Sequence, residues 1–317
     1  MKSKFFKKLL GKKLTAHTSQ VLDHTRLYKK RGEPGRALKF IPYYFYKIIK
    51  ETMLDSKNNI VTVNDLSMKV IPNDIGISRE LLIFKTHEPL VTDIIKNEIK
   101  QGMFCIDIGC NIGYYALLES KLVGDKGNII TFEPSPINFR FFNDNLKLNN
   151  ITNVKAYNFA IGDNNSKINF LIADWSNASR VVEANYPTTN TEKIIPVAVK
   201  KLDTIIEKEG FSQVDFIRMD IEGYEFNAYE GMKNTIKKFK PKLLIEVHGN
   251  LMGIDKTIKF LNKIEEDGYD LKYYAPRKLD KPWIANKEKD VEEISIKTLI
   301  QLLKYNKIPD CFHIFLQ

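Results

Sequence analysis

Short apolar segments alternate along the chain with longer segments in which apolar side chains recur every three or four residues. The first pattern predicts strands and the second predicts helices. The predicted strands cover residues 104–109, 128–134, 154–162, 214–221, 242–248, 271–275 and 311–316. The predicted helices cover residues 88–100, 112–123, 136–148, 225–238, 254–266 and 295–305.

This alternation predicts one α/β domain over residues 56–317. Strands joined by helices of about 10 to 15 residues imply right-handed crossovers and a mostly parallel sheet with helices on both faces. The segments 104–109 and 128–133 are apolar at nearly every position, as burial on both faces requires. We therefore predict a doubly wound, Rossmann-like fold.

Two stretches interrupt the alternation. Residues 60–84 contain three β-like segments, IVTV, MKVI and ELLIF, separated by polar turns such as PNDIG. Residues 163–196 form a polar insertion that contains Trp175, Asn177, Ser179 and Arg180. Such side chains on a loop above the strand ends suit a lid over a sugar, and they equally suit the packing of a surface hairpin.

The basic charge of the chain lies in its N-terminal segment. Residues 1–50 contain 14 Lys and Arg against two acids, a net of +12, whereas the other residues have 35 basic and 37 acidic side chains, a net of −2. Apolar side chains would line one side of a helix there, at Phe5, Phe6, Leu9 and Leu10. We expect residues 1–55 to form a basic, aromatic-rich, helical extension.

Three roles suit this extension. A basic amphipathic helix followed by tyrosines suits an anionic membrane surface, where each cation contributes about 1 kcal/mol. The same charge suits RNA phosphates. A solvated arm with a docking helix needs neither partner.

The cysteines favour a reducing compartment. Cys105, Cys110 and Cys311 are too few for a disulfide framework and have no metal-ligand spacing. No apolar run of about 18 residues predicts a membrane span, and the first residues lack the apolar core of a signal peptide. We expect a cytoplasmic protein, with peripheral contact at the inner membrane surface through residues 1–50.

The sequence IDIGCNIGYY, at residues 106–115, marks the predicted ligand site. Open parallel sheets bind ligands at the carboxyl ends of their strands, and Asp107, Gly109 and Gly113 lie at such an end. A dinucleotide site needs G-x-G-x-x-G to hold pyrophosphate, but a carboxylate occupies the first glycine position here. A carboxylate about 5 Å from a phosphate costs about 3 kcal/mol at an effective dielectric constant of about 20. With a ligand that carries an ammonium and a sulfonium group, the same carboxylate interacts favourably.

S-adenosylmethionine carries those two cations, and acids follow the next two strands. Glu133 closes the second strand, where a carboxylate can accept both ribose hydroxyls. Asp163 follows the third strand, where it can accept from the adenine amino group. Gly109 and Gly113 allow close backbone approach to the methionine end, where Asn111 offers its amide.

Each acid alone also suits a local role. Asp107 suits a helix N-cap, Glu133 a surface position at a strand end, and Asp163 a turn. Their occurrence in order, at the ends of three successive strands, favours S-adenosylmethionine as the cofactor.

The sequence also resembles the FkbM-type methyltransferases, a branch of the class I S-adenosylmethionine-dependent enzymes. The resemblance runs from about Glu88 to His248 and rests on HEPLVT, IDIGCNIGYYALLESKLVGDKGNIITFEPSPINF, LKLNN, AIGD, LDTII and VDFIRMDIEGYEFNAYEGM. It implies a seven-stranded sheet with an antiparallel last strand. It also implies methyl transfer to oxygen, often on a sugar, glycan or polyketide-like acceptor, and it adds Glu88 to the cofactor-binding residues.

Methyl transfer to a hydroxyl needs a group that takes its proton. The fourth and fifth core strands end in Asp220 and His248, and we expect both to face the transferring methyl group. Asp220 is the first candidate for base or orienting group, joined by Glu222, and a neutral His248 titrates near working pH. Glu225 is expected to stabilise the next helix electrostatically. These side chains also suit a divalent cation, but no local spacing supports one, and no metal site is predicted.

The sequence therefore predicts an O-methyltransferase for a hydroxyl of a sugar, glycan or related metabolite, including a lipid-linked one. The alternative is an RNA (tRNA) methyltransferase with a basic N-terminal arm. Against RNA, the catalytic domain is net acidic, and DIEG stands where amino-group methylation needs N-P-P-Y. A binding module that kept the cofactor pocket without catalysis is a third alternative.

Overall fold

The computed structural model describes residues 59–183, 185–282 and 285–317, together with Arg26, Lys29, Pro42, Phe45, Tyr46 and Lys47. The amphipathic helix predicted near Phe5 and nearly all of the basic extension lie outside the described residues. Among the described helices, none has both the length and the apolar character needed to cross a membrane.

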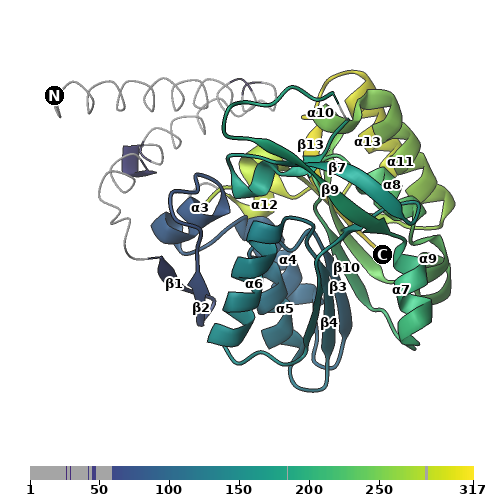
Figure 1. The fold of residues 1–317 in the computed structure, drawn as a ribbon. Helices are drawn as coiled ribbons and strands as arrows, with labels where there is room; N and C mark the ends of the chain where they lie inside the picture. Colours follow the sequence, from purple (N-terminus) through teal and green to yellow (C-terminus); the bar gives the residue numbers. More distant parts are fainter. Residues whose placement is uncertain are drawn as a thin grey trace.

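A seven-stranded sheet forms the centre of the molecule (Figure 1). Its strands follow the order β12-β13-β11-β10-β3-β4-β5. Their bounds are β3 Phe104–Ile108, β4 Asn128–Phe132, β5 Val154–Tyr157, β10 Phe216–Met219, β11 Lys242–His248, β12 Leu271–Pro276 and β13 Cys311–Leu316. The last strand, β13, runs antiparallel to both β11 and β12. The predicted doubly wound fold with an antiparallel last strand is confirmed.

Helices cover both faces of this sheet (Figure 1). One face carries α4 Pro89–Glu98, α5 Tyr114–Val123 and α6 Pro136–Leu148. The other carries α7 Leu202–Glu209, α8 Glu225–Glu230, α9 Lys233–Phe239, α11 Ile254–Glu266 and α13 Ile296–Lys304. Successive residues of β3 alternate between the two cores: Ile106 and Ile108 pack with the second set, and Cys105 packs with the first. Burial on both faces explains why these strands are apolar at consecutive positions.

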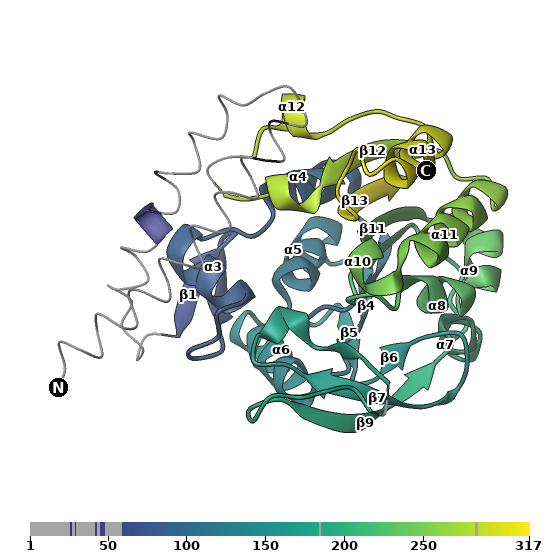
Figure 2. The ribbon, with the colours of Figure 1, turned by 90° about the horizontal axis from the view of Figure 1, so that it is seen from above.

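The insertion predicted over residues 163–196 belongs to a second, four-stranded sheet of order β6-β9-β7-β8. Its strands are β6 Ala160–Ile161, β7 Ser166–Ile172, β8 Arg180–Val181 and β9 Lys193–Lys200. Seen from above, β6, β7 and β9 lie beyond β5 (Figure 2). The alternating apolar positions of β7 and β9 bury one face of this sheet, at Phe170, Val197 and Val199.

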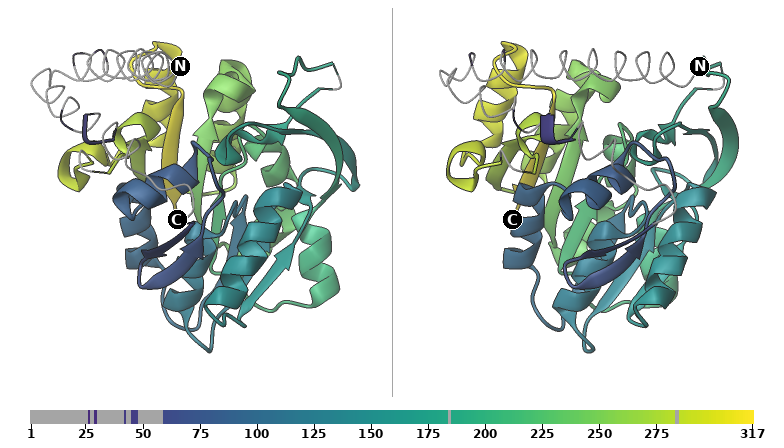
Figure 3. Two further views of the ribbon diagram at one scale, coloured as in Figure 1. Left: turned by 60° about the vertical axis from the view of Figure 1, so that its left-hand side comes forward. Right: turned by 90° about the vertical axis from the view of Figure 1, so that its left-hand side faces the viewer.

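An antiparallel hairpin, β1 Ile60–Val63 and β2 Leu66–Lys69, precedes the main domain and packs against α6 (Figure 3). Asn145 and Asn149 of α6 donate side-chain hydrogen bonds to the carbonyl oxygens of Lys69 and Ser67, at 3.0 Å and 2.7 Å. The hairpin is thus fixed to the domain by polar contacts as well as by its buried valines.

Three predicted elements differ from the structure. ELLIF is the second half of helix α3, Ile77–Phe84, rather than a strand, because the Asp74 carboxylate accepts from the amide of Ser78 and supports the first turn. The strand predicted over 154–162 divides into β5 and β6, since Asn158 between them donates to the carbonyl of Glu133. The helix predicted over 225–238 divides into α8 and α9 at Gly231, which packs against the backbone of Gly162.

Candidate active site

The carboxyl ends of the central strands form one wall of a pocket. It lies where the chain changes direction across the sheet, with β4 and β5 on one side of β3 and β10 and β11 on the other. Residues at the ends of β3, β4, β10 and β11 line it, namely Gly109, Glu133, Asp220 and Glu246. This switch point is where open α/β sheets bind ligands.

Two glycines shape the loop after β3. Gly109 has a φ of +89°, and a Cβ atom there would lie 2.0 Å from the carbonyl oxygen of Asp220. A Cβ atom at Gly113 would lie 2.3 Å from the ring of Phe142. Gly109 lines the pocket, whereas Gly113 does not. The sequence predicts that both glycines make room for a ligand, and the structure shows that both are needed for contacts within the protein.

Glu133 lies on the pocket wall directly after β4. Its Oε2 accepts from the amide of Asn111 at 2.9 Å, and its Oε1 accepts from the amide of Ser135 at 2.8 Å. Burial raises the pKa of Glu133 to about 7, and the two amide hydrogen bonds oppose the rise. Each carboxylate oxygen has a second lone pair, so both can still accept from hydroxyl groups of a ligand.

The pocket wall beside Glu133 is apolar. It is formed by Phe159 and by the two residues of β6, Ala160 and Ile161. Asp163 is not among the lining residues, and its carboxylate accepts from the side-chain amides of Asn164 and Asn227, at 2.9 Å and 3.0 Å. The structure therefore places Asp163 in a bridge to α8, whereas the sequence predicts it at the adenine amino group.

The loop between β7 and β8, here called the Ser176 loop, lines this side of the pocket. The carbonyl oxygen of Ser176, in the 3-10 helix η2 Ser176–Ala178, accepts from the side-chain amides of Asn111 and Asn138, at 3.1 Å and 3.0 Å. From the other side, the Asp74 carboxylate accepts from the amide and the hydroxyl of Ser176, at 2.9 Å and 2.8 Å. The loop is thereby tied to β3, α6 and the turn before α3.

The predicted lid residues divide between the pocket and the surface. Asn177 and Ser179 line the pocket. Trp175 is exposed, and Arg180 donates to the hydroxyl of Tyr186 at 2.5 Å. Neither of these two residues lines the pocket.

Arg218, on β10, connects two predicted site acids. Its guanidinium lies 2.9 Å from the Asp107 carboxylate and 2.8 Å from that of Asp220, and 4.1 Å from the ring centre of Tyr115. Asp107 is 0% exposed and does not line the pocket, whereas Arg218 does. The charge of Asp107 is therefore balanced inside the protein rather than directed at the ammonium of a ligand, where the sequence predicts it.

Glu88 lies at the N-terminus of α4, is buried and lines the pocket. Its carboxylate accepts from the hydroxyl of Tyr115 at 2.9 Å and lies 2.9 Å from Nε of Arg277. Burial opposes ionisation, but the neighbouring Arg277 guanidinium and His87 ring lower the pKa of Glu88 to about 2. Arg277 also lies 2.8 Å from Glu246, so one guanidinium joins two buried carboxylates.

The structure brings together the three residues predicted for catalysis. Asp220, Glu222 and His248 each offer a side-chain atom within 4.8 Å of the other two. Asp220 and Glu222 line the pocket, and His248 does not. Burial raises the pKa of Asp220 to about 6 and that of Glu222 to about 8.

Carboxylates surround His248. Its Nδ1 lies 2.8 Å from Glu225, and its Nε2 lies 3.4 Å from Glu222 and 3.5 Å from Glu246. Burial favours the neutral ring, but the charges of Glu246, Glu225 and Glu222 raise the pKa of His248 well above its usual value. The sequence predicts a neutral imidazole, whereas this surrounding favours a protonated one.

Sequence reasoning overlooks several residues of the site. Arg218 leaves a signal, since it is a lone cation in an otherwise apolar core strand. Asp74 lies in PNDIG, which reads as an ordinary turn. Arg277 follows β12, outside the recognised motifs, and no local pattern marks it.

Comparison with known proteins identifies a family to which this sequence matches. A family model described as the methyltransferase FkbM domain matches residues 107–271, slightly more than half of the 317 residues. The matched part begins at Asp107 and includes the central strands from β4 to β11.

Several named proteins are similar over part of their length. Methyltransferase 1 of Beauveria bassiana is 26% identical over 41% of this chain and 58% of its own length. The 2-O-methyltransferase NoeI of Sinorhizobium fredii is 25% identical over 51% of this chain and 69% of its own. The hexuronic acid methyltransferase AglP of Haloferax volcanii is 22% identical over 53% of this chain and 65% of its own.

Among solved structures, a methyltransferase FkbM from Methylobacillus flagellatus aligns with a TM-score of 0.42 and 18% identity. The alignment covers 67% of this chain and 43% of that one.

Proposed function

The chain belongs to the FkbM methyltransferase family, whose methyl donor is S-adenosylmethionine, and we propose that it methylates a hydroxyl oxygen of a sugar, glycan or related metabolite. One observation carries the proposal: the pocket has Glu133 on one wall, at the end of β4, and Asp220 on another, at the end of β10. The pocket thus offers a carboxylate to a nucleoside and a second one to an acceptor. When bound, S-adenosylmethionine supplies a methyl group made electrophilic by a positively charged sulfur.

The residues on the β4 side fit an adenosine group. Each oxygen of Glu133 keeps a lone pair for a ribose hydroxyl, and the apolar wall at Phe159 suits a flat base. The Ser176 loop covers this region, which keeps water from the bound nucleoside. In our proposal Asp163 contributes by holding the neighbouring loop against α8, rather than by touching the base.

The residues on the β3 side fit the methionine end. Glu88 is ionised and lines the pocket, so we propose that it faces the ammonium group. Asp107 contributes by balancing the positive charge of Arg218. Asn111 and Gly109 shape the loop that follows β3. These assignments keep opposite charges together within a water-poor site.

On the acceptor side, Asp220 and Glu222 are the residues that we propose to contact the hydroxyl group. Both line the pocket, and Asp220 is paired with Arg218. The Asp220 carboxylate would accept the hydroxyl proton as the oxygen bonds to the methyl carbon, the carbon–sulfur bond breaks and S-adenosylhomocysteine leaves. Holding the acceptor in line contributes roughly 7 to 11 kcal/mol in well-aligned systems, so orientation by these acids is as important as proton removal.

The named relatives support a sugar hydroxyl as the acceptor. One is a hexuronic acid methyltransferase and another a 2-O-methyltransferase. A lipid-linked glycan would be met at a membrane surface, where the 12 net positive charges of residues 1–50 would favour anionic lipid. We propose this contact for a cytoplasmic protein that binds the inner membrane surface peripherally.

The direct test supplies tritiated S-adenosylmethionine and follows the label into glycolipid, soluble glycan and RNA from the same cells. The expected result is label in a glycan fraction that D220N loses, while D220N still binds S-adenosylhomocysteine. Label in RNA alone would overturn the acceptor assignment, and full activity of D220N would remove Asp220 from the mechanism. Deletion of residues 1–50 should abolish binding to anionic vesicles, and unchanged binding would contradict the membrane contact.

A further inference from the structure

Three groups of side chains in the described part of the chain have ligand atoms close enough to share one metal ion. They are Glu88, Glu246 and His313; Glu246, His248 and Cys311; and Asp220, Glu222 and His248. The second group shares Glu246 with the first and His248 with the third, and the surroundings of each group show which of them is open to an ion.

A guanidinium already takes the place of a cation in the first group. Nε of Arg277 lies 2.9 Å from Oε1 of Glu88 and 2.8 Å from Oε1 of Glu246. The remaining oxygen of Glu246 lies 3.3 Å from Nε2 of His313. The buried guanidinium of Arg277 balances one of the two carboxylate charges, and its repulsion of a divalent ion keeps a metal from the same oxygens.

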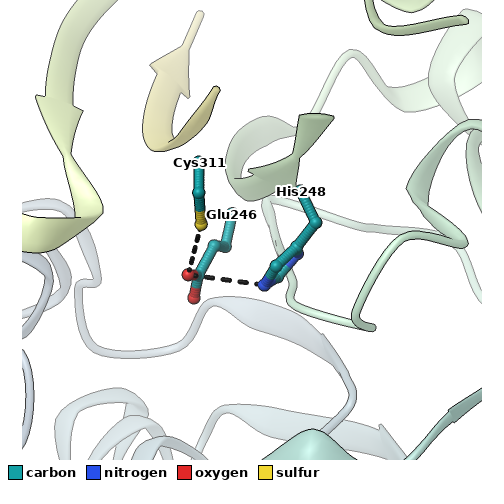
Figure 4. Close-up of side chains that lie close together, drawn as sticks. All are labelled: Glu246, His248 and Cys311. Carbon is teal, nitrogen blue, oxygen red and sulfur yellow. Dashed lines mark hydrogen bonds and ion pairs between the residues drawn. The ribbon is translucent and has the colours of Figure 1, made fainter. Parts of the chain in front are cut away.

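The second group depends on the same oxygen. Figure 4 shows one carboxylate oxygen of Glu246 facing both Cys311 and His248. That atom, Oε1, lies 3.5 Å from Sγ of Cys311 and 3.5 Å from Nε2 of His248. Since Arg277 lies closer to Oε1 than either of them, this group is also occupied by a cation of the protein.

We propose that the third group, Asp220, Glu222 and His248, binds a divalent metal ion on the acceptor side of the pocket. Arg218 contacts only Oδ2 of Asp220, which leaves Oδ1 available. Within the described residues, the Glu222 carboxylate has no hydrogen bond, and its one ion-pair contact is with His248 at 3.4 Å. Asp220 and Glu222 line the pocket, so an ion has a path to them.

The orientation of His248 provides independent support. Its Nδ1 is hydrogen-bonded to Glu225, which is buried and also accepts from the amide of Gly223 at 2.9 Å. Glu225 thus fixes the ring so that Nε2 faces Glu222, and a metal ion that binds there displaces the Nε2 proton favoured by the surrounding acids. His248 is 4% exposed, and its Nε2 faces two carboxylates, 3.4 Å from Glu222 and 3.5 Å from Glu246. A carboxylate that orients a histidine through one nitrogen, with the other directed at acidic side chains, is the usual surrounding of a metal-binding imidazole.

The donor set indicates the kind of ion. Two carboxylates and one imidazole suit Mn²⁺ or Zn²⁺ better than Ca²⁺, which prefers oxygen alone. Three protein ligands leave coordination positions open toward the pocket. In the context of the proposed function, on which this role rests, the ion binds hydroxyl oxygens of the acceptor and holds one of them toward the methyl group.

The test is a calorimetric titration of the full-length, EDTA-treated protein with Mn²⁺, and in parallel with Zn²⁺ and Mg²⁺, in the absence of any methyl donor. Wild-type protein should bind one Mn²⁺ or Zn²⁺ per chain. E222Q and D220N should each weaken that binding at least tenfold, and E225Q by about 10- to 100-fold through the orientation of His248. C311S is the matched control, and it should bind the ion with unchanged affinity.

Two results would overturn the proposal: no saturable binding of any of the three ions, or loss of binding in C311S but not in E222Q. A titration of every variant with S-adenosylhomocysteine shows whether its pocket is folded. That second titration also separates the two claims. Failure to bind S-adenosylhomocysteine contradicts the proposed function, whereas failure to bind metal with an intact nucleoside site contradicts only the metal site.

Discussion

Asp107 and Arg218 are directly paired positions on the neighbouring parallel strands β3 and β10, and their side chains form a buried ion pair at 2.9 Å. The pairing explains how a core strand accommodates an arginine, since a buried charge needs a partner of opposite sign. Arg218 also reaches Asp220, so the same cation links the centre of the sheet to the acceptor side of the pocket.

Replacing Arg218 by methionine should lower the free energy of unfolding by about 3 to 5 kcal/mol, because Asp107 is then buried without a partner. Urea unfolding measures the loss. The double variant D107N/R218M should recover part of it, since no unpaired carboxylate remains in the strand. Wild-type stability of R218M, or a double variant no more stable than R218M, would contradict the buried pair.

The affinity for S-adenosylhomocysteine should depend on pH through Glu133. Its pKa is about 7, above the usual value for glutamate, so the protonated form dominates below that pH. Only the ionised carboxylate accepts from both ribose hydroxyls, so affinity should rise as pH increases through 7, by up to about tenfold per unit below the pKa. Calorimetry at several pH values gives the profile, and E133Q should flatten it. A wild-type profile equally flat would show that Glu133 does not bind the ribose.

Loss of the Asp74 contacts should weaken nucleoside binding, because Asp74 lies outside the pocket lining but holds Ser176, which lines it. D74A removes both hydrogen bonds to Ser176, and S176A removes only the one through its hydroxyl. We expect about tenfold weaker binding of S-adenosylhomocysteine in D74A, the equivalent of one charged hydrogen bond, and a smaller loss in S176A.

The matched control for this loop is D144A, which breaks an exposed ion pair with Lys69 at 2.8 Å. Its affinity should equal that of the wild type. Equal affinities in D74A, D144A and the wild type would show that the Ser176 loop is not held for binding. Thermal unfolding of each variant confirms that the domain is intact.

Gly109 and Gly124 offer a comparison between two left-handed positions. Both have positive φ, but a Cβ atom at Gly124 would meet nothing within 4 Å, whereas one at Gly109 would lie 2.0 Å from the Asp220 carbonyl. G124A should cost about 1 kcal/mol of stability. G109A should cost more in urea unfolding and should also abolish transfer, because Asp220 is displaced. Equal losses of stability in G109A and G124A, with methyl transfer retained in G109A, would contradict the close approach of Gly109 to the Asp220 carbonyl.

Local signals in the sequence predict much of the main sheet and its helices. Helix α6 spans the predicted residues 136–148 because Ser135 caps it through the amide of Asn138 and Pro136 begins it. The strand β11 and the helix α11 also have their predicted bounds. Each of these elements has its start and stop signals within a few residues of its ends.

The contacts of the site depend on residues far apart in the sequence. Asp107 and Arg218 are 111 residues apart, and only the register of β3 against β10 brings them together. Arg277 reaches Glu88 from beyond β12 in the same way. Spacing along the chain indicates which acids end the strands, but not which cations balance them, so it predicts a free Asp107 where the structure shows a paired one.

The pocket at the switch point should bind a positively charged adenosine derivative between Glu133 and the residues around Glu88. Isothermal titration calorimetry of the wild-type protein with S-adenosylmethionine measures this binding. We expect saturable binding of one molecule per chain, weakened in E133A. No heat with S-adenosylmethionine or its demethylated product, together with clear binding of NAD or ATP, would contradict it.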